Sequence, residues 1–191
     1  MGAYTKDDEA ETAQQTYRRM LRDGMAPALR QMGFKGSGAH YRFPDETYEA
    51  GLIVRKWSYS TKEVAYFDVG WFVRHPPTMD AYNSAPRDAR SDGKPTAGYY
   101  GESLEDLVWR RDNLFEEFRQ SGYTVNRPGW WEMPTGTRIS PWFGWWSLPA
   151  GGPIEPLAQT VIKAIRELGL PAIQREIERP LDPRWAIQTS D

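Results

Sequence analysis

Apolar residues recur at every third or fourth position early in the chain, which is the period of an amphipathic helix. The residues that share this apolar face are Ala13, Tyr17, Met20, Leu21, Ala28, Leu29 and Met32. Gly24 and Pro27 interrupt the pattern, because proline lacks a backbone donor and crowds the preceding turn. The spacing therefore predicts a helix that starts at Thr5, is kinked or split between residues 22 and 28, and ends at Gly33.

Beyond Gly38 the apolar period changes to two, which is typical of strands that bury one face. Three runs show this alternation, at residues 39–43, 48–60 and 64–73. In the third run one face is entirely apolar and consists of Ala65, Phe67, Val69, Trp71 and Val73. The opposite face mixes polar and aromatic residues, namely Tyr66, Asp68, Gly70, Phe72 and Arg74. Because turn residues separate the runs, we expect consecutive antiparallel hairpins.

A long polar segment follows the third run. Residues 74–101 are rich in Pro, Gly and Asp, so we expect a long loop that is functional or partly mobile. A middle helix is predicted after this loop, because Ser103 and Asp106 have the spacing of a capping box and Gly122 supplies a stop.

The remaining patterns complete the predicted fold. A further strand is predicted within residues 137–148, followed by one helix that ends at Gly169 and another at residues 171–179. The order of elements indicates the α+β class. We expect residues 1–180 to form a single domain, an antiparallel β-sheet with an N-terminal helix, a middle helix and C-terminal helices packed on it. Residues 181–191 are predicted to be a C-terminal tail.

Tryptophans are concentrated in residues 127–149, which hold five of the nine in the chain. Such a density is typical either of a stacking platform for sugars or bases, or of a hydrophobic core. Adjacent strand residues point to opposite faces, so Trp145 and Trp146 cannot share one platform, and we expect them in the core. Trp130 and Trp131 lie among Pro and Gly residues and are better candidates for a surface contact.

The composition excludes several classes of protein. The net charge of −2 gives no general attraction for nucleic acid or anionic lipid. The chain has no cysteine, which excludes disulfides and thiolate metal sites. No apolar run has the length of a membrane span, and the first residues lack the apolar segment of a secretion signal. We therefore expect a cytoplasmic protein with no membrane partner and no nucleic-acid partner.

Several short motifs resemble those of one bacterial family. A helix is followed by a Gly-Phe-Lys turn and an aromatic-Arg strand, and two adjacent tryptophans precede helices with a Leu-Pro step. The matching residues are Gly33, Phe34, Lys35, Tyr41, Arg42, Trp145, Trp146, Leu170 and Pro171. This arrangement resembles the bacterial domain-of-unknown-function 4304 family over residues 17–177. The resemblance implies a fold and leaves the function open, because the activity of that family is unknown.

A cluster of charges falls in or beside the predicted strands. Its members are Arg42, Arg55, Asp68, Arg74 and Arg138. Charges in a sheet are costly unless they are paired or reach water at the rim. One interpretation, which we favour, is an ion pair between Asp68 and an arginine, with the other charges at the rim. The other is an arginine-lined concave face that receives an acidic partner or an anion.

These features support three functional hypotheses. The first is a non-enzymatic module that binds another protein through its long loop and one sheet face, by analogy an immunity or inhibitor protein. The second is a domain that binds a small molecule or carbohydrate through an aromatic wall of Tyr99, Tyr100, Trp130 and Trp131.

The third hypothesis is an enzyme of unknown class that uses Asp68 or His75 as a base, and it has the least support. His40 and His75 lack metal-ligand spacing, and the chain has no nucleophile elbow, phosphate-binding loop or dinucleotide motif. We expect no metal and no cofactor.

Overall fold

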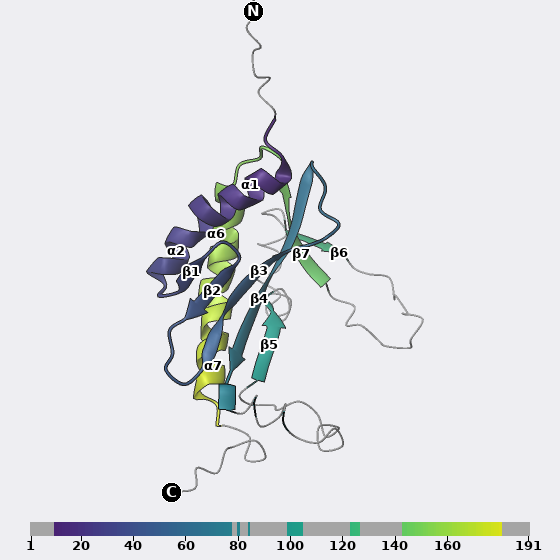
Figure 1. Ribbon diagram of the computed structural model, residues 1–191. Coiled ribbons are helices and arrows are strands. Elements are labelled where there is room, and N and C mark those ends of the chain that lie inside the picture. The colour runs from purple at the N-terminus through teal and green to yellow at the C-terminus, as the bar shows by residue number, and fades with distance from the viewer. Residues whose placement is uncertain are drawn as a thin grey trace, which may run out of the picture.

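The computed structural model describes residues 10–77, 80, 84, 99–104, 123–126 and 143–180, without the side chains of residues 99–103, 123–126 and 143–145. Within these residues, seven strands form one antiparallel sheet, and the helices lie on one side of it (Figure 1). This arrangement confirms the predicted α+β class.

The sheet is built around one long central strand. The strands are β1 (Lys35–Ser37), β2 (His40–Phe43), β3 (Glu49–Lys56), β4 (Val64–Arg74), β5 (Tyr99–Ser103), β6 (Tyr123–Asn126) and β7 (Phe143–Pro149). Their order is β1-β2-β3-β4-β7-β6, and β5 also pairs with β4. One edge of β4 pairs with β3, while the other edge is divided between β7 at residues 64–67 and β5 at residues 70–74.

Two predictions about strands need correction. The predicted strand at residues 48–60 ends at Lys56, because Ser60 turns the chain by bonding the Trp57 carbonyl and the Tyr66 amide. Residues 99–101, assigned to the long loop, belong to β5. Ser103, the predicted capping residue of the middle helix, ends that strand, and Leu104 directly after it is helical, as predicted. The rest of the middle helix, residues 137–142 and the tail lie outside the described residues.

The N-terminal helical segment is divided as its sequence predicts. It consists of α1 (Ala13–Arg19), a π-helical turn η1 (Met20–Met25) and α2 (Ala26–Gln31). The predicted start at Thr5 is wrong, because residues 10–12 are not helical and Thr12 caps α1 through a reciprocal capping box with Gln15. The segment ends before Gly33, whose φ of 91° is left-handed.

The predicted break at Gly169 is also wrong. The C-terminal segment runs from α6 (Glu155–Ala164) through a π-helical turn η3 (Ile165–Gly169) into α7 (Leu170–Glu178). Gly169 keeps a helical φ of −66°, and Pro171 falls in the first turn of α7, where a missing N–H is tolerated. The helical path is therefore continuous from Glu155 to Glu178.

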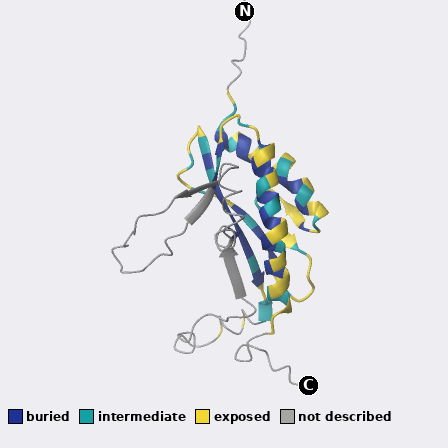
Figure 2. Cartoon of the chain, turned by 180° about the vertical axis from the view of Figure 1, so that it is seen from behind, coloured by how far each residue is buried: buried dark blue, intermediate teal, exposed yellow. Residues whose placement is uncertain are grey.

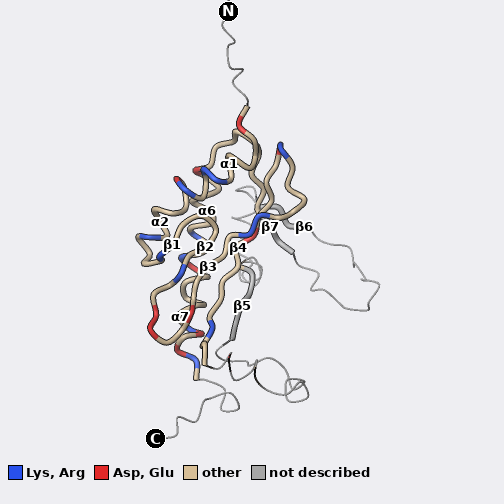
Figure 3. Tube along the Cα trace, in the orientation of Figure 1, with Lys and Arg blue, Asp and Glu red and all other residues tan. Residues whose placement is uncertain are grey.

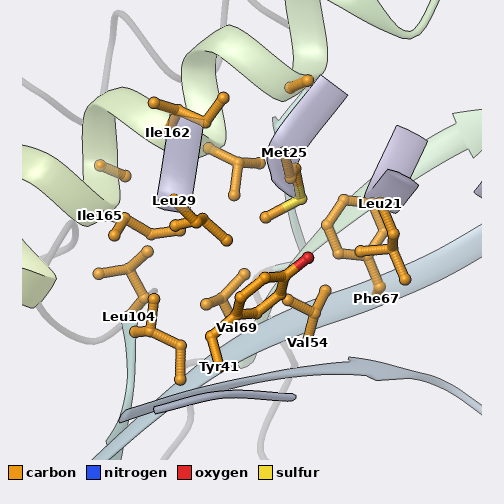
Figure 4. Packing of buried hydrophobic residues seen from close by; sticks show 14 of the residues in the cluster. Leu21, Met25, Leu29, Tyr41, Val54, Phe67, Val69, Leu104, Ile162 and Ile165 are labelled. Atoms are coloured by element: carbon orange, nitrogen blue, oxygen red, sulfur yellow. The ribbon is translucent and has the colours of Figure 1, made fainter. Parts of the chain in front are cut away.

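The core lies between the helices and one face of the sheet (Figure 2). The predicted apolar face of β4 is buried at all five of its positions, Ala65, Phe67, Val69, Trp71 and Val73. Figure 4 shows side chains from β2, β3 and β4 meeting those of both helical segments. Trp146 is fully buried, as expected for a core residue, and it pairs with Phe67 across β7 and β4.

Two buried tyrosines differ in how their hydroxyls are satisfied. Tyr17 donates to the Val54 carbonyl at 3.1 Å, whereas the buried Tyr41 hydroxyl has no hydrogen-bond partner among the residues that the structure describes. Burial raises the pKa of both phenols. Each hydroxyl therefore stays protonated at neutral pH. Folding removes the hydrogen bonds that both hydroxyls make to water, and only the Tyr17 hydroxyl gains a hydrogen bond within the protein in return.

We expect Tyr17→Phe to lower the free energy of unfolding by about 1 kcal/mol, because the variant loses a buried hydrogen bond. Tyr41→Phe should be neutral or raise that free energy by up to about 1 kcal/mol, since it removes a buried hydroxyl without a partner. Urea denaturation of the two variants checks the contrast. Equal losses in both would show that the Tyr41 hydroxyl does make a bond in solution.

Candidate functional site

The sheet face directed away from the helices carries the predicted charge cluster. We call it the outer face and define it by the residues that alternate with the buried positions: His40 and Arg42 of β2, Gly51, Ile53 and Arg55 of β3, and Tyr66, Asp68, Gly70, Phe72 and Arg74 of β4. Strand register places Arg42, Gly51 and Phe72 in one row across three strands. The outer face therefore brings together four of the five predicted cluster residues, while Arg138 lies outside the described residues.

The outer face is hollowed over β2, β3 and the end of β4. The hollow has a volume of about 830 Å³, which is within the usual range for ligand sites. Its outer-face lining consists of His40, Arg42, Ile53, Phe72 and Arg74. Lys35 also lines it, and Asp45, Glu46 and Glu49 lie where the hollow meets the turn between β2 and β3 (Figure 3). The site thus has an apolar floor, basic residues along its strands and acidic residues at one end.

Arg74 and Arg42 have no carboxylate partner among the residues that the structure describes. Arg74 lies opposite Glu49 in the strand register, but its guanidinium stands 5.1 Å from the centroid of the Phe72 ring, a cation–π contact. Arg42 is exposed and faces Phe72 across Gly51, which has no side chain. Both guanidinium groups are therefore open to an anionic partner.

The predicted ion pair of Asp68 is present, and its partner is Arg55. Arg55 Nε donates to Asp68 Oδ1 at 2.7 Å; the Asp68 side chain is 12% exposed and that of Arg55 54%. The same guanidinium lies over Gly70, where an added Cβ would be 3.3 Å from its Nη2. A buried carboxylate therefore fixes an arginine whose outer side remains accessible.

The predicted aromatic wall stays a prediction. Tyr99 and Tyr100 belong to β5 and pair with Arg74 and Val73, but their side chains, like Trp130 and Trp131, lie outside the described part. A different aromatic group gathers at the β3–β4 turn, which the sequence analysis missed. It consists of Trp57, Tyr59 and Tyr66.

Tyr59 joins this group at ring-centroid distances of 5.0 Å to Trp57 and 5.3 Å to Tyr66. The i,i+2 spacing of Trp57 and Tyr59, together with hairpin pairing to Tyr66, is the signal that could have revealed it. The rings are inclined by 67° and 43°, so they do not form one flat stacking platform.

The two residues that the enzyme hypothesis offered as alternative bases lie at different places on β4 and its continuation. Asp68 and His75 are seven positions apart along β4 and its continuation, a separation of roughly 20 Å in an extended chain. His75 packs beside the Tyr48 ring, and burial lowers its pKa. Among the described residues, no cluster of His, Asp and Glu could hold a metal ion.

Comparison of the chain with protein-family models, curated proteins and solved structures finds no match. The resemblance to the domain-of-unknown-function 4304 family therefore stays a prediction. In the described part of the chain, no helix is both long and apolar enough to cross a membrane.

Proposed function

We propose that this protein is a non-enzymatic module that binds another protein through the outer face of its sheet. The main support for this proposal is the hollow on that face, where Arg42 and Arg74 lie around the partly exposed Phe72 and Ile53. Neither arginine has a carboxylate partner in the described part of the chain. Arginine and aromatic residues around an apolar centre are the groups that contribute most to protein–protein binding. The chain has no cysteine, which suits a cytoplasmic setting.

The shape of the site favours a protein partner over a small ligand. The hollow is bounded by strands and by the β2–β3 turn, and near that turn it presents the basic Arg42 and Arg74 beside the acidic Asp45, Glu46 and Glu49. A folded partner or an extended segment can meet the basic and the acidic groups at once, with charge complementarity fixing its orientation. A small molecule would contact only part of this surface.

We expect a tagged form of the protein to capture one stoichiometric partner from a lysate of its native host, identified by mass spectrometry. The double variant Arg42→Glu, Arg74→Glu should reduce capture by at least about tenfold, because each change replaces an attractive charge by a repulsive one. The thermal midpoint should stay close to that of the wild type, since both arginines are exposed.

A matched control is the double variant Arg18→Glu, Arg175→Glu, which makes the same change in net charge on the helical layer, where both residues are exposed. This variant should retain the partner. Equal loss with both double variants would indicate a non-specific electrostatic effect and contradict the proposal. Unfolding of the Arg42, Arg74 variant alone would show that these arginines are structural.

A further inference from the structure

Arg55 is held in a fixed position by groups that leave its terminal nitrogens accessible. Its Nε is bonded to the buried Asp68 carboxylate, and its guanidinium lies against the strand at Gly70. No hydrogen bond engages Nη1 or Nη2 among the residues described. A guanidinium can donate end-on to a second carboxylate through these two nitrogens while Nε keeps its bond to the first.

Arg55 lies beside the hollow and extends its basic side. Gly70, under the guanidinium, is the register partner of Ile53, which lines the hollow. Arg42 and Arg74 lie further along the same face. Neighbouring strands are about 4.8 Å apart and alternate residues about 6.6 Å apart. Counted in register from Arg55, Arg42 lies about 13 Å and Arg74 about 20 Å further along the strands, so these basic groups are spaced for an extended chain lying along the strands.

The charges give this surface a direction. Asp45, Glu46 and Glu49 lie at the turn end of the hollow, where Arg74 is the register partner of Glu49 and offsets part of their negative charge. Arg55 lies away from that turn, since it pairs with Asp68 near the middle of β4. Of the three arginines, Arg55 therefore lies farthest from these acidic groups, and a carboxylate bound there is repelled least by them.

We propose that the outer face takes an extended acidic segment of a partner protein, with one carboxylate of that segment bound end-on by Arg55. This inference rests on the proposed function and adds the chemical class of the bound segment. Asp68 acts as a positioning residue, because it orients Arg55 without itself meeting the ligand. Gly70 leaves room for the guanidinium to lie flat on β4.

The probe is fluorescein-labelled hexaglutamate, whose binding to the full chain is followed by fluorescence anisotropy at low ionic strength. Arg55→Gln should raise the dissociation constant about tenfold, which is the effect expected for the loss of one charge-assisted hydrogen bond. Arg55→Lys should recover part of this loss, since it restores the charge without the two-nitrogen fork. Arg18→Gln, on the helical layer, removes the same charge and should leave the affinity unchanged.

The variant Asp68→Asn tests whether Asp68 affects binding by orienting Arg55 or only through its negative charge. Removing a negative charge would by itself strengthen the binding of an anionic peptide. Loss of the Arg55–Asp68 bond should instead weaken binding several-fold, because Arg55 is no longer held in place. Circular dichroism confirms that each variant is folded. Tighter binding by a folded Asp68→Asn variant would overturn the positioning role.

The remaining outcomes distinguish this inference from the proposed function. If hexaglutamate does not bind, or binds equally well to Arg55→Gln, while capture of the native partner still depends on Arg42 and Arg74, the acidic-segment inference fails and the binding module stands. If an oligothymidylate of similar length binds more tightly than hexaglutamate with the same dependence on Arg55, the ligand is a nucleic acid and the inference is wrong.

Discussion

Gly51→Ala is expected to lower the free energy of unfolding by about 3 kcal/mol, because the new methyl group has no space. Gly51 is buried in β3 and pairs with Arg42 of β2 and Phe72 of β4. A Cβ at this position would overlap the Tyr41 carbonyl oxygen and lie 3.1 Å from the Arg42 Cα. These are backbone atoms, so relief requires β2 and β3 to separate, at the expense of their hydrogen bonds.

Urea denaturation measures this loss, with Gly38→Ala as the control. Gly38 has a left-handed φ of 61°, but a Cβ there would meet nothing within 4 Å. Its replacement should cost about 1 kcal/mol, for backbone conformation alone. If Gly51→Ala costs no more than Gly38→Ala, the two strands accommodate the methyl group and the close approach is not a constraint.

The same glycine shapes the candidate site. Arg42 and Phe72 are the cross-strand neighbours of Gly51 on either side, and a side chain between them would fill the space that they share. Gly51→Ala should therefore also reduce capture of the partner, even at a temperature where the variant remains folded.

Trp146→Ala is expected to lower the free energy of unfolding by about 4 kcal/mol. Trp146 is fully buried, and it is among the largest side chains of the core. It pairs with Phe67 of β4 and Tyr123 of β6, so its loss opens a cavity where three strands meet. The surrounding backbone is tied into the sheet and cannot collapse to fill that space.

Urea denaturation should give a graded series for this position, with Trp146→Phe losing less than Trp146→Ala because the smaller ring fills part of the cavity. Tyr59→Ala is the matched aromatic control. Tyr59 is 45% exposed, so its removal should cost about 1 kcal/mol or less. A loss at Trp146 no larger than that at Tyr59 would contradict a core role and reopen the stacking interpretation.

The regular elements of the core could be predicted because their pattern is local. In β4 the alternation of residues 64–73 gave the buried face, since successive side chains of any strand point to opposite sides. The division of the N-terminal helix was visible at Gly24 and Pro27. The two residues fall in a π-helical turn and at the start of the next α-helix.

The missed strands are those whose stability comes from backbone pairing. β1 has only exposed residues, so no hydrophobic pattern marks it, and its hydrogen bonds to β2 define it. β5 and β6 were absent from the sequence analysis for a related reason, because short strands depend on the neighbour that receives them. The continuous helix past Gly169 likewise depends on packing, since an isolated glycine favours a stop.

The sequence by itself determined the α+β class, the buried face of β4, and the fact that Asp68 and Arg74 lie on the opposite face of that strand. These properties follow from residue periodicity, which every strand or helix expresses alone. Only the tertiary structure decided that the helices cover one face and that Arg55, among the candidate arginines, pairs with Asp68. It also placed Arg42 and Phe72 on either side of Gly51. Those facts depend on strand order and register, which are set by contacts between residues distant in the chain.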